Sequence, residues 1–209
     1  MIGNIVLCLI LGYAFGCFST GYVCGKKQQV DVRKHGSGNI GTTNTLRTLG
    51  FKAGVVTLIG DILKAIIPIC LLCILYKKTN QPLSRDLVVL YTGLGVVCGH
   101  NFPFWLKFKG GKGIAAMAGV IIAFNPWLTI IEMILFLGIV AITRYVSLGS
   151  LVVATVLPLS VLIGYKNDPN YLHMVIVCFI FMLLAFYKHR ENIKRLLTGT
   201  ENKFGKKAA

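Results

Sequence analysis

The chain has 209 residues, of which 55% are hydrophobic and 14% are charged, and its mean hydropathy is +0.72. Soluble domains carry about 25% charged residues, so this composition excludes an ordinary water-soluble protein. Lys and Arg number 22 against 7 acidic residues, a formal charge of +15. Such a charge fits nucleic acid, anionic lipid or an anionic substrate, and the positions of the basic residues must decide between them.

Apolar segments run through the chain at about residues 2–25, 53–76, 86–105, 114–143, 147–164 and 171–187. Their lengths approach the ~20 residues that a helix needs to cross a bilayer. The first segment lacks the basic start and cleavage site of a signal peptide, so we expect it to remain as a helix. The fourth is too long for one comfortable crossing and contains Asn125 and Pro126, a pair typical of a helix break. Dividing it there gives spans at 114–124 and 127–143.

The distribution of Lys and Arg distinguishes six spans from seven. With seven spans, one side of the membrane holds 17 of these residues and the other holds 4. With six spans, the basic tail would lie on the side that has few Lys and Arg residues. We therefore predict an all-α polytopic membrane protein, a single domain over residues 1–209 with seven transmembrane helices. The N-terminus lies outside, the C-terminus inside, and the inner loops form the site. These loops face anionic lipid and cytoplasmic anions, so nucleic acid is not an expected partner.

The predicted fourth span has only about a dozen residues and is roughly 18 Å long at 1.5 Å per residue. It cannot cross the hydrocarbon by itself. Unless the fifth helix tilts, the loop before it must dip below the membrane surface, which requires protein or a wet cavity around it.

The first inner loop, residues 35–47, is rich in glycine and in side chains that donate hydrogen bonds. No strand precedes it, so its GxGxxG spacing does not indicate a dinucleotide fold. Glycines let successive N–H groups converge on one anion, and Arg47 can bind two oxygens at once. A flexible polar linker is the alternative. The candidate phosphate-binding residues are Gly36, Ser37, Gly38, Asn39, Gly41, Thr42, Thr43, Asn44 and Arg47.

The second inner loop leads into the short helix, and a helix N-terminus with free N–H groups favours anions. It is not a Walker A sequence, because Leu106 and Gly113 stand where that pattern needs Gly and Ser or Thr. Interfacial lysines are the alternative explanation. The candidate residues are Lys109, Gly110, Gly111, Lys112 and Gly113.

The basic tail continues as a helix that places His189, Asn192 and Arg195 at three-residue spacing. An ordinary amphipathic tail attracted to lipid also fits this segment. Taken together, three polar segments on one face, two of them suited to phosphate, indicate a site for two phosphate groups.

The sequences of these segments resemble the signature motifs of the bacterial acyl-phosphate:glycerol-3-phosphate acyltransferase family. The motifs are GSGNIG followed by Thr, Thr, Asn and Arg, then GHNFP, FKGGKG and a tail of the form HRxNIxRLxxGxE. The resemblance covers the chain from the first helix to the tail. At the position of Thr42 the family more commonly has Ala. The added hydroxyl beside the loop bears only on the fine positioning of the site.

The resemblance implies an inner-membrane enzyme with a cytoplasmic site that starts phospholipid synthesis. It would transfer an acyl group from acyl phosphate to sn-glycerol 3-phosphate, giving 1-acyl-sn-glycerol 3-phosphate (lysophosphatidate) and phosphate. It also implies coupling to the enzyme that produces acyl phosphate. Of the implied site residues, Ser37, Arg47 and Lys112 line the phosphate sites, and His189 and Asn192 hold glycerol phosphate. Ser147 is carried over as well.

The sequence lacks the His-x-x-x-x-Asp dyad typical of enzymes that use thioester donors. An acyl phosphate has a good leaving group, so positioning and charge stabilisation can suffice. The proton acceptor is a substrate phosphate oxygen or, alternatively, His189. We expect no metal and no cofactor. Asp61 and Lys64, three apart within the second span, are expected to form a structural pair, and Glu132 has no obvious local partner.

Two other classes of function compete with an enzyme. A transporter or channel for phosphorylated metabolites would use the same anion-binding loops, but would need sites near the membrane midplane with access from both sides. A membrane scaffold would not need glycine-rich loops. Acyl-chain length and oligomeric state do not follow from the sequence.

Overall fold

The computed structural model describes residues 1–79 and 82–205, and every regular segment within this part of the chain is helical. The chain forms two compact units, residues 1–124 and 125–209, which are described separately.

Unit 1 contains six α-helices and two short 3₁₀ turns in its described part. They are α1 (Ile2–Gly16), α2 (Thr20–Lys27), η1 (Val32–Lys34), α3 (Thr42–Leu49), α4 (Phe51–Lys78), α5 (Arg85–Asn101), η2 (Phe104–Leu106) and α6 (Ile114–Phe124). The predicted first span is therefore two helices. They meet at residues 17–19, where the Ser19 side chain accepts a hydrogen bond from the Tyr22 N–H and so caps α2.

Helices α1 and α5 pack with their backbones in direct contact, and two pairs of glycines make this possible. A Cβ atom on Gly12 would lie 2.1 Å from the Thr92 carbonyl oxygen, and one on Gly16 would lie 2.1 Å from that of Val96. From the other side, Gly95 and Gly99 face the α1 backbone in the same way. Both helices thus carry glycines four residues apart, the small-residue spacing that lets membrane helices approach closely.

The loop between α5 and α6 runs back along α5. The N–H groups of Gly110 and Gly111 donate to the carbonyl oxygens of Asn101 and His100, at 3.2 and 3.0 Å. As a result α6, with its 11 residues, begins beside the last turns of α5. At its other end, Arg85 Nη2 donates to the Ala123 carbonyl oxygen at 2.6 Å and caps the helix.

Unit 2 contains α7 (Pro126–Thr143), α8 (Val146–Gly164), α9 (Tyr171–Lys188) and α10 (Arg190–Leu197). The predicted break between residues 124 and 127 is present, because α6 ends at Phe124 and α7 begins at Pro126. The Asn125 side chain accepts from the Leu128 N–H and caps α7, while Pro126 occupies the first helical position, where its missing N–H costs nothing.

Six helical segments of the described chain are long and apolar enough to cross a membrane: Ile2–Lys27, Phe51–Lys78, Arg85–Leu106, Pro126–Thr143, Val146–Gly164 and Tyr171–Lys188. The seventh apolar helix, Ile114–Phe124, is shorter. Large apolar side chains such as Ile134 and Ile142 on α7 are exposed, as expected of helices that face lipid. The fold is therefore that of a helical integral membrane protein.

Candidate active site

The first loop is organised around the Asn44 side chain, which is buried. Its amide nitrogen lies 2.9 to 3.1 Å from three acceptors, the carbonyl oxygens of Val32, His35 and Asn39, and its oxygen accepts from the Ser37 N–H at 2.9 Å. Asn44, expected to contact phosphate, thus holds the loop closed in this structure.

The remaining candidates of the first loop lie on or beside the start of α3. Gly36 and Gly38 have φ angles of 57° and 69°, which favour glycine, and the loop exposes Ser37. Asn39 accepts from the N–H of Gly41, the N-cap residue of α3, where no side chain caps the helix. The first turn of α3 therefore presents its N–H groups in a position suited to an anion.

Thr42, Thr43 and Arg47 all belong to α3 and are half-buried. The Thr42 hydroxyl is buried and has no hydrogen-bond partner among the described residues. Near the loop, the Arg33 guanidinium donates to Asp31 and holds the pKa of that carboxyl at about 2, so this acidic group is charged at physiological pH.

In the second loop, Lys112 is half-buried and Lys109 is exposed. We expected the glycines beside Lys112 to offer N–H groups to an anion. In the structure the Gly110 and Gly111 N–H groups donate to α5 carbonyls, and a Cβ atom on Gly111 would lie 2.0 Å from His100 Nε2. These two glycines thus allow close packing on α5, and Gly113, with φ of 85°, supplies the turn into α6.

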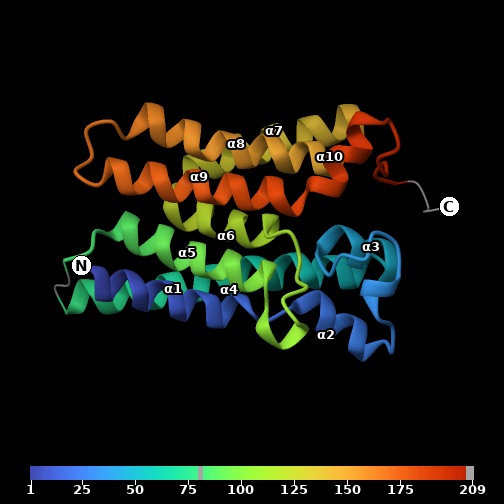
Figure 1. The fold of residues 1–209 in the computed structure, drawn as a ribbon, viewed down its shortest axis with the longest axis horizontal. Helices are drawn as coiled ribbons and strands as arrows, with labels where there is room; N and C mark the ends of the chain where they lie inside the picture. Colours follow the sequence, from blue (N-terminus) through green and yellow to red (C-terminus); the bar gives the residue numbers. More distant parts are fainter. Residues whose placement is uncertain (80–81, 206–209) are drawn as a thin grey trace. The chain divides into compact units, whose positions relative to one another are not determined.

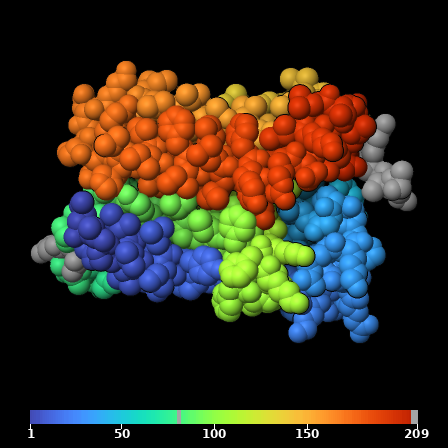
Figure 2. Space-filling view, in the orientation of Figure 1, coloured from blue at the N-terminus to red at the C-terminus, as the bar shows by residue number. Residues whose placement is uncertain are grey.

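The two loops pack together at one end of unit 1 (Figure 1). Val32 and Ile40 of the first loop form a buried apolar cluster with Leu106 of the second. The Tyr22 and Trp105 rings meet edge to face with centroids 5.1 Å apart, and Trp105 Nε1 donates to the Cys17 carbonyl oxygen at 2.8 Å. Figure 2 shows the two segments as neighbouring surfaces of this unit. The structure therefore brings together the elements that carry Ser37, Arg47 and Lys112.

A buried polar cluster lies between α4 and α5 of the same unit. Lys64 Nζ is 2.9 Å from Asp61 Oδ1, which confirms the predicted pair. The same nitrogen is 2.7 Å from His100 Nδ1 and 2.8 Å from the Phe18 carbonyl oxygen. Sequence analysis treated His100 only as part of a motif, because nothing local in the sequence indicates its contact with Lys64.

Unit 2 carries the other candidate residues, and three polar side chains of this unit meet around Glu201. One Glu201 oxygen accepts from Ser147 Oγ at 3.1 Å and from Asn192 Nδ2 at 2.8 Å, and the other accepts from Arg195 Nε at 2.8 Å. Asn192 and Arg195 therefore share a helix face, as their spacing predicts. Sequence analysis missed Glu201 as a site residue, although its place at the end of the tail motif was a usable signal.

His189 is buried at the junction of α9 and α10, and its Nδ1 lies 2.8 Å from the Ala185 carbonyl oxygen. A carbonyl can only accept, so the neutral ring carries its proton on Nδ1 and a lone pair on Nε2. This tautomer suits an acceptor of a proton or of a hydrogen bond at Nε2.

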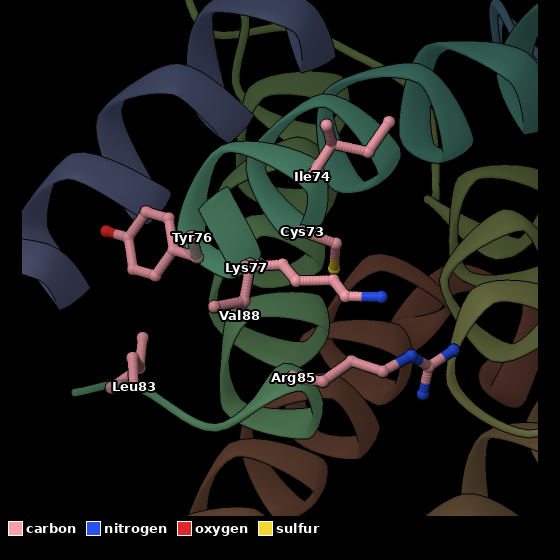
Figure 3. A pocket seen from close by; sticks show the side chains of 7 residues that line it. All are labelled: Cys73, Ile74, Tyr76, Lys77, Leu83, Arg85 and Val88. Atoms are coloured by element: carbon pink, nitrogen blue, oxygen red, sulfur yellow. The ribbon is translucent and has the colours of Figure 1, made fainter. Parts of the chain in front are cut away.

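Other features of the described chain lie apart from these loops. A cavity of about 560 Å³ lies at the opposite end of unit 1, where α4 ends and α5 begins (Figure 3). Its lining comprises Cys73, Ile74, Tyr76, Lys77, Leu83, Arg85 and Val88. Glu132 is buried within α7, and its Oε1 has no hydrogen-bond partner in the described part. In that part no three His, Cys, Asp or Glu side chains are grouped so that they could hold a metal ion.

The fold and these residues define an integral membrane protein with two polar loops packed together and a tail that carries a buried histidine. Comparison with known proteins gives the family. Residues 6–199 match the model of the glycerol-3-phosphate acyltransferase family. The chain belongs to this family.

Relatives cover nearly the whole chain. It is 42% identical to the glycerol-3-phosphate acyltransferase of Alkaliphilus metalliredigens, over 98% of both chains. It is 39% identical to that of Thermoanaerobacter pseudethanolicus, over 97% of this chain and 96% of the relative. Among solved structures, it matches crystal structures of PlsY (YgiH), an integral membrane glycerol 3-phosphate acyltransferase. The glycerol 3-phosphate form aligns with a TM-score of 0.83 and 36% identity over 96% of each chain. The lysophosphatidic acid form aligns with a TM-score of 0.80 over 96% of this chain and 95% of that one.

Proposed function

We propose that this protein transfers an acyl group from acyl phosphate to sn-glycerol 3-phosphate, giving 1-acyl-sn-glycerol 3-phosphate and inorganic phosphate. The observation that carries this proposal is the match over 96% of the chain to PlsY structures in glycerol 3-phosphate and lysophosphatidic acid forms. Those two structures are named for a substrate and a product of the proposed reaction, which supports the proposal.

Residues of both units serve the reaction in this proposal. Ser37, Arg47 and Lys112 of unit 1 bind phosphate, and Lys112 and Arg47 stabilise the charge that develops on the leaving phosphate. His189 and Asn192 of unit 2 bind glycerol 3-phosphate. The glycines and polar residues around them shape the two loops, and Ser147 supports the tail through Glu201.

The chemical step requires no protein nucleophile. The 1-hydroxyl oxygen of glycerol 3-phosphate attacks the acyl carbonyl carbon, the bond from that carbon to the phosphate oxygen breaks, and inorganic phosphate leaves. The hydroxyl proton passes to a substrate phosphate oxygen. Because the donor is a mixed anhydride, positioning and charge stabilisation lower the barrier sufficiently.

His189 is the rival proton acceptor, since its tautomer leaves a lone pair on Nε2. A pH–rate profile of kcat decides between the two. A single ionisation in the histidine range that disappears in His189→Asn would support the histidine. An ionisation in the same range that persists in His189→Asn would support the substrate phosphate, whose second pKa is also about 6.

The acyl donor is tested by supplying purified protein with glycerol 3-phosphate and, in parallel, acyl phosphate, acyl-CoA or acyl carrier protein. We expect lysophosphatidate from acyl phosphate alone. Product from a thioester donor would overturn the proposed donor. If no donor gives product and vesicles containing the protein take up either phosphate, transport replaces acyl transfer as the function.

We also infer seven crossings, with the N-terminus outside, the C-terminus inside and the site on the cytoplasmic face of a bacterial inner membrane. One support is the unequal division of basic residues between the two sides. The other is α6 itself, which begins after Gly113 beside the end of α5 and finishes beside Arg85 at the start of α5. A C-terminal fusion to a reporter active only outside the cell should be inactive. Activity of that fusion would refute this topology.

A further inference from the structure

The buried cluster around Lys64 consists of one cation and three acceptors. An ammonium group has three N–H donors, and Lys64 Nζ lies within 2.9 Å of Asp61 Oδ1, the Phe18 carbonyl oxygen and His100 Nδ1. The side chains of Asp61 and Lys64 are 2% and 4% exposed. Every donor of this buried cation therefore has an acceptor, and the three acceptors come from α4, from the α1–α2 break and from α5.

This arrangement fixes the protonation of His100. Its Nδ1 accepts from the Lys64 ammonium, so the proton of the neutral ring must lie on Nε2. A doubly protonated ring would place two cations 2.7 Å apart. Asp61 Oδ1 also lies near the ring, 3.7 Å from His100 Nδ1. Both atoms are acceptors, and Lys64 Nζ donates to each of them.

The other edge of the imidazole supports the second loop. Gly111 lies against Nε2 so closely that a Cβ atom there would be 2.0 Å from it. The Gly111 N–H donates to the His100 carbonyl oxygen, and the Gly110 N–H donates to that of Asn101. The backbone that leads to Lys112 therefore rests on His100, both on its ring and on its main chain.

We infer that His100 is a positioning residue for Lys112: Lys64 holds the imidazole through Nδ1, and the imidazole supports the turn at residues 110–113. This inference rests on the proposed acyl transfer, in which Lys112 stabilises the leaving phosphate. It assigns the buried pair Asp61 and Lys64 to the support of that loop.

His100→Asn is the first test, because an asparagine amide oxygen can still accept from Lys64 but does not reach the loop. We expect kcat to fall about 10- to 100-fold, since small displacements of a catalytic group have effects of this size. KM for glycerol 3-phosphate should stay within about twofold, with kcat expressed per amount of folded protein, because loss of folded protein by itself lowers the apparent kcat at unchanged KM. His173→Asn, at the start of α9, is the matched control and should leave both parameters unchanged.

A double-mutant cycle tests whether His100 acts through Lys112. If it does, His100→Asn combined with Lys112→Ala should be no slower than Lys112→Ala alone. Losses that multiply would overturn the inference, as would an unchanged kcat in His100→Asn.

Hydrogen exchange provides a measurement that does not depend on activity. In His100→Asn the amides of Gly110 and Gly111 should exchange at least about 10-fold faster, while those of α3 stay as they are. If wild-type protein makes no lysophosphatidate but exchange responds in this way, the proposed reaction fails and the support of the loop stands. Unchanged exchange would overturn the support itself.

A second variant covers the case in which His100→Asn does not fold. Asp61→Asn combined with Lys64→Met removes both buried charges together, so neither is left unpaired. It should show the same loss of kcat and the same faster exchange at 110–111. A folded double variant with normal kcat and normal exchange would refute the role of the pair.

Discussion

At the scale of single residues, glycine is required at some positions of this chain and replaceable at others. Gly111 is needed because the loop backbone crosses the His100 ring, whereas Gly138 on α7 has no atom within 4 Å of the place where a Cβ would lie. Both are glycines in or beside apolar segments of one chain. Their neighbours, which lie far away in the sequence, determine which of the two tolerates a side chain.

Gly111→Ala should therefore impair the protein, because the added methyl group meets the clamped imidazole and the loop must shift. We expect kcat to drop about 10- to 100-fold, as for other small displacements of a catalytic group. Gly138→Ala is the matched control and should leave activity unchanged, with stability equal or up to about 1 kcal/mol higher. Equal activity of the two variants would show that the loop accommodates the methyl group.

Glu201→Gln should destabilise the tail of unit 2. The carboxylate accepts from Ser147, Asn192 and Arg195, and an amide can neither accept from all three in the same way nor pair with the guanidinium. We expect a loss of about 1–3 kcal/mol in the free energy of unfolding, measured by denaturation in detergent. Glu191→Gln, at an exposed carboxylate 3.8 Å from Arg190, should change it by less than about 0.5 kcal/mol.

At the scale of the elements, short sequence spacings decide how helices meet. Gly12 and Gly16 on α1 face α5, while Gly95 and Gly99 on α5 face α1, so the two backbones approach without side chains between them. The spacing of four was visible in the sequence. Its partner was not, because the two glycine pairs are about 80 residues apart.

Gly12→Ala should weaken the α1–α5 contact, since its Cβ would lie 2.1 Å from a backbone oxygen that cannot rotate away. We expect a loss of about 1–3 kcal/mol, the usual cost of an extra methyl group in a packed contact, seen as a lower thermal midpoint in detergent. Gly3→Ala lies on the same helix with nothing within 4 Å and serves as the control. Equal midpoints for both variants would contradict the close approach.

At the scale of the whole molecule, candidate residues are divided between two compact units. Unit 1 carries Ser37, Arg47 and Lys112, and unit 2 carries Ser147, His189 and Asn192. In the proposed reaction this division corresponds to two roles, stabilisation of the leaving phosphate and binding of glycerol 3-phosphate.

Lys112→Ala and Asn192→Ala should therefore have different kinetic effects. Lys112→Ala should lower kcat by about 100-fold or more, because charge stabilisation is lost mainly in the transition state. Asn192→Ala should raise KM for glycerol 3-phosphate about tenfold, the effect of one lost hydrogen bond, with a smaller change in kcat. The measurement is a steady-state analysis in which each substrate is varied in turn. A normal kcat in Lys112→Ala would refute its assigned role.

Much of the fold followed from the sequence. The helical membrane class, the break at Asn125 and Pro126 and the short helix after the second loop depend on the length of apolar runs and on residues adjacent in the chain. The segments that carry the candidate site could also be predicted, because the donor-rich loops and the basic tail are recognised from residues adjacent in the chain. The break of the first span at residues 17–19 was not predicted, although Ser19, which caps α2, is a local signal of a helix start.

The sequence by itself determined the kind of protein and the segments that carry its chemistry, because hydrophobicity and charge act through composition along the chain. Tertiary structure alone decided that Asn44 closes its loop, that Gly110 and Gly111 pack on α5, and that Lys64 holds His100. It also decided that Glu201 gathers Ser147 and Asn192. The physical reason is distance along the chain: His100 lies 36 residues from Lys64 and Ser147 lies 54 residues from Glu201, and only folding brings their atoms within hydrogen-bonding reach.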